Sequence, residues 1–466
     1  MPCKCSGLAV IFAYMSEKEA KCMSVCVSEQ LLSQWSEAYR NSPERQMATM
    51  ALSRSDLNSV DVVPNQAAKM RHKFSLNLET LPVTNQKQSG RCWLFAATNV
   101  LRESIAQKLN LKDFELSQSY LAFWDKFERA NYFLDLMIRH ADVPANDRTV
   151  SFILATGVHD GGQWDMFANI VRKYGVVPKD VYDETYQSSS TRAMNHVLNR
   201  SLKAGTARLR AMKKAGASQD ELESVQKEIM GKVYGFLCSC YGGEPPCCFD
   251  FEYVDKDGAY HEEKGMTPRT FADKYASETL NESVSIIHAP TADKPWHEMF
   301  TVKYLGNVVG MDQVKHLNLP LDEMKAAIIR QMQDGKVVWF GSDVGKFGDR
   351  DNGYWDDTSF QAELLTGLDL AISKEDSLNL GFAAMNHAMV LTGVHLEDGR
   401  PVRWRIENSW GDEKGKKGYY ICSDTWFDQY VFQAAVEKKY LLDNAQYLTR
   451  TPVELEPWDP MGTLAE

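Results

Sequence analysis

The sequence predicts an α+β fold in which a helical first part precedes a β-rich second part. Segments of helical length and periodicity dominate the chain up to about residue 235. After the turn Asp334-Gly335, short runs rich in Val, Ile, Trp and Tyr follow one another instead. Strands that alternated with helices would indicate a parallel α/β sheet, so this segregated order favours α+β.

The helical part begins with a polar helical pattern and an extended stretch. The extended stretch, at 73–86, has alternating apolar positions and a proline. The last helix of the series opens after Gly161-Gly162 and stops at Gly175, as glycine at a helix end predicts. The helices expected in this part cover residues 27–60, 92–109, 118–140 and 163–174.

Two stretches interrupt this pattern and are interpreted as insertions. Residues 190–235 are rich in Ala, Lys, Arg, Glu and Met, and they predict two helices that break near "KAGAS". Residues 243–310 mix proline, glycine, aromatic residues and short strands such as "VSIIHAP". Neither stretch matches a compact catalytic core.

The β-rich part follows a helix, "LDEMKAAIIRQMQ", at 321–333. Each strand expected after it is a short apolar run bounded by turn residues. These strands cover residues 336–344, 387–396, 402–410 and 418–423.

The composition is that of a globular protein, and it excludes several classes. The chain has 466 residues, of which 44% are hydrophobic and 25% charged, so it can bury a large core. A net charge of −11 argues against a nucleic-acid footprint over the whole protein, although a local basic patch stays open. No apolar run approaches the roughly 18 residues of a membrane span. The apolar stretch at 7–15 is interpreted as part of a variable extension, because acidic residues follow it at once and no cleavage pattern stands out.

The ten cysteines do not form a spaced disulfide framework. Four of them lie in "CSCYGGEPPCC" (238–248), which raises the question of a metal site. Their spacing lacks the paired C-x₂-C of zinc modules and no histidine lies close by, so reduced thiols are expected instead. A cytoplasmic location follows from this cysteine usage.

Cys92 is notable for its place, after a Ser-Gly-Arg turn and at the first turn of an apolar helix, in "NQKQSGRCWLFAATNVLR". A helix N-terminus carries about half a positive charge, which stabilises an anion such as a thiolate. A thiol whose pKa is lowered in this way is a nucleophile near neutral pH. A small buried hydrophobic residue is the alternative reading, and this local feature does not decide between them.

A thiolate nucleophile requires a base and a group that orients the base. His387 opens the expected strand "HAMVLTGV", and Asn408 ends "WRIEN". An imidazolium can hold a thiolate as an ion pair and later protonate the leaving amine, and an asparagine can orient the imidazole without carrying charge. Each residue taken singly also fits a structural role, so the prediction depends on all three and on their flanks.

These flanks resemble the papain-type cysteine peptidases. The resemblance is carried by Gln-x₅-Cys-Trp at 86–93, Asn-His-Ala at 386–388 and Asn-Ser-Trp-Gly at 408–411, with "ELSQSYL" and "GGQW" between them. His387 lies 295 residues after Cys92, whereas that family has about 130–150, and the two insertions account for the excess. Ser89 stands where secreted members carry a disulfide cysteine, which fits a reducing compartment.

Several longer stretches are similar to the bleomycin hydrolase group of that family over residues 65–466. They are "TNQKQSGRCW", "DGGQWDM", "VWFGSDVGK", "WRIENSWG" and the terminal "WDPMGTLAE". The resemblance implies a papain-like fold with inserted segments. The implied organisation is a variable N-terminal extension at 1–45, a nucleophile-bearing helical half at 46–189, a helical insertion at 190–242, a hook-like oligomerisation insertion at 243–320, a β half at 321–450 and a C-terminal arm at 451–466.

The resemblance also implies a role for each matching residue. Cys92 would be the nucleophile, His387 the acid and base, and Asn408 the residue that orients His387. The Gln86 side chain and the Cys92 backbone N–H would stabilise the oxyanion, at about 3 kcal/mol for each donor. No metal or cofactor is implied. Substrate contacts are expected from Gly161, Gly162, Met385, Asn386, Trp410 and Glu466, and Trp410 would also cover the bond between His387 and Asn408.

The last residues, "EPWDPMGTLAE", are expected to form an arm in the active-site cleft, as in bleomycin hydrolases. The terminal carboxylate of Glu466 would pair with the free α-ammonium group of a substrate. Because the arm fills the cleft, the enzyme would be an aminopeptidase rather than an endopeptidase. A frayed terminus is the alternative, and Trp458 and Pro460 argue for a docked arm.

The implied partners are peptides with a free N-terminus and further copies of the chain in a homohexamer, with an ability to deamidate bleomycin-like amides. The basic stretch at 200–214 is interpreted as a solvated helix face, so nucleic acid is not favoured, and no membrane is expected. Two other classes stay open: a nucleic-acid-binding or chaperone-like hexamer, and another thiol acyl-transfer enzyme such as a transglutaminase. The residues around Gln86 and Asn408 favour the peptidase.

Overall fold

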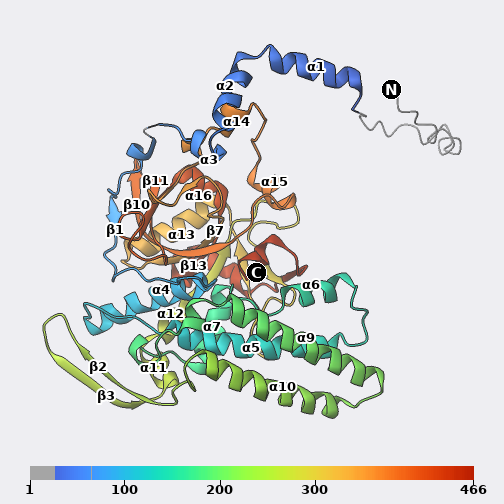
Figure 1. Cartoon of the computed structure of the whole chain (residues 1–466). Coiled ribbons are helices and arrows are strands. Elements are labelled where there is room, and N and C mark those ends of the chain that lie inside the picture. The colour runs from blue at the N-terminus through green and yellow to red at the C-terminus, as the bar shows by residue number, and fades with distance from the viewer. Residues whose placement is uncertain (1–26, 65, 466) are drawn as a thin grey trace, which may run out of the picture. The chain divides into compact units, whose positions relative to one another are not determined.

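A computed structural model describes residues 27–64 and 66–465, which form two units (Figure 1). The first unit contains the chain up to Val62 together with Gln361–Leu370. The second contains Val63–Phe360 and the chain from Ala371 onward. The apolar stretch at 7–15 and the terminal Glu466 lie outside the described residues.

The first unit is helical, as the pattern of residues 27–60 predicts. A serine or aspartate side chain caps the start of each of its first three helices by accepting a backbone N–H. The Arg45 guanidinium donates to the Thr366 carbonyl, and the Gln361 N–H donates to the Asp61 carbonyl, so two distant segments are joined. The helices are α1 (Glu29–Arg40), α2 (Pro43–Leu52), α3 (Leu57–Val60) and α14 (Ala362–Thr366).

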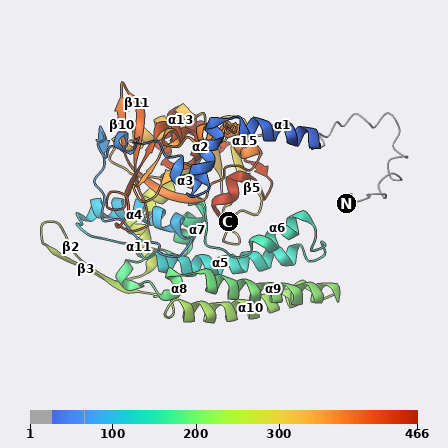
Figure 2. The same ribbon diagram turned by 45° about the horizontal axis from the view of Figure 1, so that its top comes forward.

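Long helices build the first half of the second unit. α4 (Cys92–Leu109), α5 (Gln118–Arg139) and α7 (Trp164–Tyr174) confirm three predicted helices. The predicted pair in the first insertion is α9 (Arg192–Lys214) and α10 (Gln219–Cys240), which lie beside α5 in both views (Figures 1 and 2). The remaining helices are α6 (Arg148–Thr156), α8 (Tyr186–Ser189), α11 (Pro268–Tyr275), α12 (Ser277–Glu282), α13 (Leu321–Gln333), α15 (Lys374–Asn379) and α16 (Asp424–Tyr430).

A mixed sheet of twelve strands forms the other half of this unit, in the order β14-β5-β6-β4-β13-β7-β10-β11-β12-β9-β8, with β1 paired to β10. A separate hairpin, β2 (Phe249–Val254) and β3 (Tyr260–Met266), extends away from the helices (Figures 1 and 2). The sheet strands are β1 (Leu76–Asn77), β4 (Ser283–Ile287), β5 (Met299–Val302), β6 (His316–Asn318), β7 (Val338–Ser342), β8 (Gly348–Asp349), β9 (Tyr354–Trp355), β10 (His387–Glu397), β11 (Arg400–Glu407), β12 (Tyr419–Ser423), β13 (Val431–Glu437) and β14 (Val453–Leu455). Segments of 3₁₀ helix lie at Gln66–Lys69, Lys179–Val181, Asp357–Ser359 and Pro460–Ala465, and a longer one at Lys438–Thr449 is interrupted at Leu442.

The four predicted β-rich runs correspond to β7, β10, β11 and β12, which are neighbours in the sheet. β7 is buried along its whole length, and this is why its sequence is an unbroken apolar run rather than an alternating one. In the register, His387 faces Ser342 of β7, and Val390 faces Glu407 of β11. β11 ends at Glu407, so Asn408 lies immediately after the strand rather than within it.

β13 was not predicted, although it is a central strand between β4 and β7. Its sequence, "VFQAAVE", carries two polar residues that are fully or almost fully buried. The Gln433 amide donates to the Ser285 hydroxyl at 2.8 Å, and the Lys336 ammonium pairs with Glu437 at 2.6 Å. A strand is not predicted from its local sequence when it contains polar residues whose hydrogen-bond partners lie in distant segments.

The two halves of the second unit meet where α4 packs on β10. The Arg102 guanidinium of α4 donates to the Glu407 carboxylate of β11 at 2.8 Å, and both side chains are almost fully buried. The Asn99 amide donates to the same carboxylate oxygen at 2.8 Å. These contacts fix the helix that carries Cys92 against the strand that leads to Asn408.

Two buried histidines of the sheet region are expected to make the fold sensitive to acid. Burial lowers the pKa of His316 to about 3, and burial together with the charges of Lys374 and Lys325 lowers that of His288 to about 3. Because these values lie below that of an unfolded histidine, the unfolded chain takes up protons first as the pH falls through about 6.5. Stability is then lost towards pH 3, at about 1.4 kcal/mol per pH unit for each histidine.

His316→Gln is therefore expected to weaken the pH dependence of stability, because it removes one such group. Denaturant unfolding at about pH 7 and pH 5.5 measures this, and the free energy of unfolding should fall less in the variant than in the wild type. His196→Gln, at an exposed position of α9, is the matched control and should keep the wild-type dependence. The same pH dependence in His316→Gln and in the wild type would contradict the prediction.

Candidate active site

A cavity of about 460 Å³ brings together residues from both halves of the second unit. Five of the predicted site residues line it: Gln86, Cys92, Gly161, Asn386 and His387. The full lining is Gln86, Gln88, Gly90, Cys92, His159, Asp160, Gly161, Thr191, Arg192, Asn195, Asn386, His387 and Leu464.

Cys92 is the first residue of α4 and is 5% exposed. The Ala388 N–H, from the residue after His387, donates to its Sγ at 3.4 Å. Burial raises the pKa of Cys92 to about 11, while the backbone N–H groups of Ala388, Trp93 and Cys92 act in the opposite direction. The N–H groups at the helix start therefore lower the pKa, as expected, but burial is the larger effect and the pKa of the thiol taken alone is raised.

His387 is buried at the start of β10 and is oriented by Asn408. Its Nε2 lies 2.9 Å from Asn408 Oδ1, and the Ser409 N–H donates to the same Oδ1 at 2.8 Å. A backbone N–H can only donate, so this atom is the amide oxygen, and Nε2 must carry a proton to donate to it. Nδ1 is then the unprotonated nitrogen that can act as a base.

The thiol and the imidazole are each neutral when considered alone. Burial lowers the pKa of His387 to about 4, the bond to Asn408 raises it, and the charge of Arg350 lowers it further. A single charge in this pocket is therefore costly. Transfer of the proton from Cys92 to His387 leaves the net charge unchanged and creates two opposite charges, whose attraction offsets part of both burial costs.

The Gln86 side chain is held in one orientation. Its carbonyl accepts from the Ser409 hydroxyl at 2.6 Å, and its amide donates to the Ser89 carbonyl at 2.6 Å. A backbone bond from the Gln86 N–H to the Ser409 carbonyl, at 2.8 Å, fixes the same pair. The amide nitrogen carries two hydrogens, so the second is available to an oxyanion in the cavity.

Trp410 covers His387. The two ring centroids lie 4.8 Å apart at an angle of 30°, and the Arg350 guanidinium lies 4.9 Å from the indole centroid. An apolar ring at this distance restricts the access of water to the bond between His387 and Asn408.

The predicted substrate-contact residues differ in their surroundings. The Gly161 carbonyl accepts from Arg129. A Cβ at Gly162 would lie 2.5 Å from the Trp93 ring, so glycine is required there by packing alone. Met385 is 1% exposed and does not line the cavity. Asn386 is exposed at the cavity, and its amide donates to Asp343 Oδ1 at 2.6 Å.

The C-terminal segment reaches the cavity, where Leu464 forms part of the lining. β14 pairs in parallel with β5, and the Gln163 amide donates to the Met461 carbonyl at 3.1 Å. Lys294 pairs with Asp459 at 2.8 Å, with both side chains less than a tenth exposed. The segment lies beside α6 and α7 in both views (Figures 1 and 2). Glu466, the predicted substrate ligand, lies outside the described residues.

Sequence reasoning missed several residues that border the cavity. Asp160 directly precedes Gly161-Gly162, so its place in "DGGQWDM" could have indicated it. Thr191 and Asn195 lie at the start of the helical insertion, and no local pattern connects them with Cys92. Ser409, which orients Gln86, lies within the motif Asn-Ser-Trp-Gly, but the sequence assigns it no role of its own.

The part of the chain that the structure describes contains no group of three or more His, Cys, Asp or Glu placed to hold a metal ion. In the cysteine-rich stretch the sulfur atoms of the exposed Cys247 and Cys248 are 3.8 Å apart. No helix among residues 27–64 and 66–465 combines the length and the apolar character needed to cross a membrane.

Comparison with known proteins shows close relatives over most of the chain. Aminopeptidase C of Lactobacillus delbrueckii subsp. lactis is 48% identical over 417 residues, which cover 89% of this chain and 91% of that protein. Aminopeptidase C of Listeria monocytogenes is 40% identical over 435 residues, which cover 93% and 98%. The crystal structure of PepW from Lactobacillus rhamnosis HN001 superposes with a TM-score of 0.91 at 43% identity, covering 94% of this chain and 99% of that one.

These comparisons confirm the predicted papain-like α+β fold and the predicted enzyme class, a cysteine-type aminopeptidase. The model of the Peptidase C1-like family matches residues 26–462. This range includes all the residues that line the cavity except Leu464. The chain therefore belongs to the Peptidase C1-like family.

Proposed function

We propose that this chain is a cytoplasmic aminopeptidase of the bleomycin hydrolase type, which uses Cys92 to remove N-terminal residues from peptides. The observation that carries the proposal is that Leu464 of the C-terminal arm lines the same cavity as Cys92 and His387. An arm in this place would block the side of the cleft that a chain preceding the cleaved residue needs, so that only substrates beginning at that residue fit. The similarity to two aminopeptidases C supports this reading.

The proposed reaction uses the groups that meet at the cavity. Cys92 passes its proton to His387 Nδ1, and the thiolate attacks the carbonyl carbon of the first peptide bond. Gln86 and the Cys92 N–H stabilise the oxyanion, and His387 then protonates the leaving amine. Water, deprotonated by His387, releases the acyl group and restores the thiol. Asn408 keeps the imidazole in the tautomer that this sequence requires.

The arm is proposed to recognise the free amine of the substrate. Several contacts hold it in place, including the buried pair of Lys294 with Asp459 and the Arg148 guanidinium 3.6 Å from the Trp458 ring centroid. A fixed arm can present the terminal carboxylate of Glu466 to an α-ammonium group in a partly desolvated site, where a charge-assisted bond is strong.

The proposal also covers the cellular compartment, a second kind of substrate and the oligomeric state. All cysteines among the described residues are free, which supports a reducing compartment. The same acyl transfer would release ammonia from a bleomycin-like amide. The insertions that contain α9, α10 and the β2–β3 hairpin are proposed to join copies of the chain in a homohexamer, and nucleic acid has no part in the proposal.

Removal of residues 459–466 is expected to change the selectivity of the enzyme. The intact protein should cleave a fluorogenic amino-acid amide and spare its N-acetylated twin. Without the arm, the ratio of kcat/KM for the two should fall by roughly 100-fold, which corresponds to about 3 kcal/mol for one bond to a charged group. Lys294→Met, which leaves Asp459 unpaired but keeps the arm, should give a smaller change in the same direction.

Equal cleavage of both substrates by the intact protein would reject the role of the arm and leave a general endopeptidase. Absence of any activity that an epoxysuccinyl thiol inhibitor blocks would reject the enzyme itself and favour a binding protein. The two outcomes are separate, because the inhibitor reports on Cys92 and the substrate pair reports on the arm.

A further inference from the structure

The carboxylate of Asp160 gathers hydrogen bonds from segments on several sides of the active-site cavity. It accepts from the Gly90 N–H at 2.9 Å, the Lys126 ammonium at 2.5 Å and the Asn195 amide at 2.8 Å, and also from the Thr191 hydroxyl. Four donors occupy the two oxygens, which matches the accepting capacity of a carboxylate. Asp160 therefore has no free site for a substrate, although it borders the cavity.

Asp160 contacts the chain on both sides of Cys92. The nucleophile loop, residues 86–92, approaches it at Gly90, where an added Cβ would lie 2.8 Å from the Asp160 Cβ. Only glycine allows this close approach. On the other side, the Trp93 indole N–H donates to the Asp160 backbone carbonyl at 2.6 Å. A shift of Asp160 would therefore move the backbone that presents the thiol.

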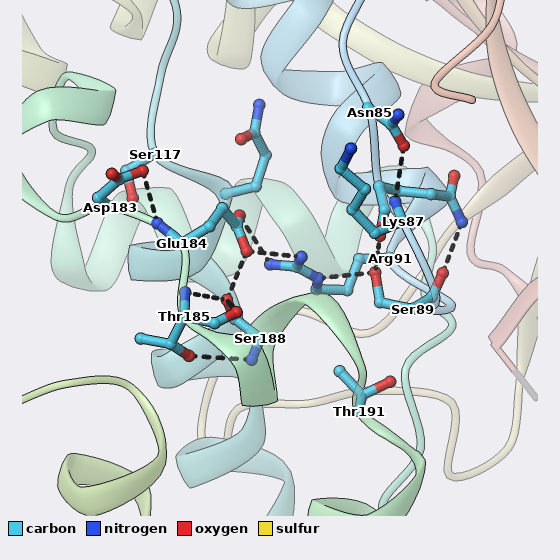
Figure 3. Close-up of polar contacts among 12 residues, drawn as sticks. Asn85, Lys87, Ser89, Arg91, Ser117, Asp183, Glu184, Thr185, Ser188 and Thr191 are labelled. Carbon is cyan, nitrogen blue, oxygen red and sulfur yellow. Dashed lines mark hydrogen bonds and ion pairs between the residues drawn. The ribbon is translucent and has the colours of Figure 1, made fainter. Parts of the chain in front are cut away.

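A second set of contacts ties the same loop to the start of the helical insertion. Figure 3 shows Arg91 directed at Glu184, and the two form a bidentate pair at 3.1 and 2.9 Å. The Gln88 N–H donates to the Ser189 carbonyl at 2.9 Å. Residues 184–189 therefore contact the nucleophile loop at Arg91 and Gln88, and Thr191 and Asn195 are joined to it through Asp160.

The Asp160 carboxylate stays charged in this place. Burial by itself would raise its pKa, but the charge of Lys126 and the bonds from Asn195 and Thr191 lower it more. The charge of Asp160 in turn raises the pKa of Cys92. The other titratable groups that face it are His159 beside it and Tyr241 after α10, and Arg129 of α5 lies close to His159.

We propose that Asp160 is a positioning residue of the active site, which fastens the nucleophile loop to α5 and to the start of α9. The bonds from Lys126, Thr191 and Asn195 fix the carboxylate, and its bond from the Gly90 N–H then holds the backbone that leads to Cys92 where the oxyanion donors must lie. The start of the helical insertion is then part of the catalytic machinery. The inference rests on the proposed acyl transfer at Cys92.

The test compares Asp160→Asn and Thr191→Val with Asn131→Ala as the matched control. Asn131 lies on α5 and accepts from Gln226 of α10 at 2.9 Å, so its loss removes a helix-to-helix contact outside the cavity. Asp160→Asn should lower kcat for an amino-acid amide by about 100-fold with KM within about threefold, the effect of a displaced reacting group. Thr191→Val should lower kcat by about tenfold, and the control should match the wild type.

A second readout separates positioning from a general loss of structure. Active-site titration with an epoxysuccinyl inhibitor counts the competent thiols, and kcat is expressed per titrated site. The pH midpoint for alkylation of Cys92 by iodoacetamide should fall in Asp160→Asn, because a negative charge near the thiolate is gone, and should stay unchanged in Thr191→Val.

Wild-type kcat per titrated site in both variants would overturn the inference, and so would a kcat lowered to the same extent in Asp160→Asn and in the Asn131→Ala control. If Asp160→Asn does not fold, Thr191→Val decides by its kcat alone. A wild-type protein that neither reacts with the inhibitor nor cleaves the amide would overturn the proposed function instead, so the two failures are distinguishable.

Discussion

Replacement of Cys92 by alanine is expected to lower kcat/KM for an amino-acid amide by at least about 10⁴-fold, as for the loss of a nucleophile from other acyl-transfer sites. The acyl-enzyme cannot form without the sulfur atom, and the oxyanion donors alone retain only a small part of the acceleration. Cys92 is buried at the start of α4, and alanine fits the same helix position, so the fold should persist. The measurement is kcat/KM together with the thermal unfolding midpoint.

The matched control for this variant is Cys240→Ser. Cys240 lies at the end of α10, is half-buried and does not line the cavity. The Cys240→Ser variant should retain wild-type kcat/KM and wild-type reaction with the epoxysuccinyl inhibitor. Activity in Cys92→Ala above about a tenth of the wild-type value would show that another group attacks the substrate.

Replacement of His387 by alanine is expected to lower kcat by about 10³- to 10⁴-fold, with a smaller change in KM. The thiol of Cys92 has a pKa of about 11 in its buried place, so without an acceptor for its proton it remains a thiol at neutral pH. Alkylation of Cys92 by iodoacetamide at pH 7 should slow by a comparable factor. Added imidazole should restore part of both rates by entering the space that the side chain leaves.

His395→Ala is the control for this prediction, because His395 lies on the same strand, β10, outside the cavity. It should leave kcat and alkylation unchanged. If His387→Ala lowered kcat but left alkylation at the wild-type rate, His387 would act only after the acyl-enzyme has formed. The proposed proton transfer from Cys92 would then be wrong.

Both predictions depend on burial as much as on contact. The cavity penalises a lone thiolate and a lone imidazolium, so the reactive pair is accessible only through a transfer that keeps the net charge at zero. Asp160 adds a negative charge to the surroundings of Cys92, which works against the thiolate, whereas its proposed benefit is that it positions the nucleophile loop. Charge and position therefore act in opposite directions at this residue.

Local sequence determined much of the fold. The helices α4, α5 and α7 and the strands β7, β10, β11 and β12 follow from periodicity and from glycine at the ends, because those signals act over a few residues. β13 escaped prediction, since its buried Gln433 and Glu437 are stabilised by partners far along the chain. A polar residue can be assigned to a buried strand only when the group that hydrogen-bonds to it is known.

The sequence by itself also indicated four residues of the site, because Cys92, His387, Asn408 and Gln86 each stand in a short pattern that suggests their chemistry. Only the tertiary structure decided that Asp160, Thr191 and Leu464 border the same cavity, because they come from separate segments that packing brings together. The tertiary structure also decided that the pKa of the Cys92 thiol is raised rather than lowered. A helix start favours the thiolate through nearby dipoles, but burial depends on everything packed around the sulfur, and here burial is the larger effect.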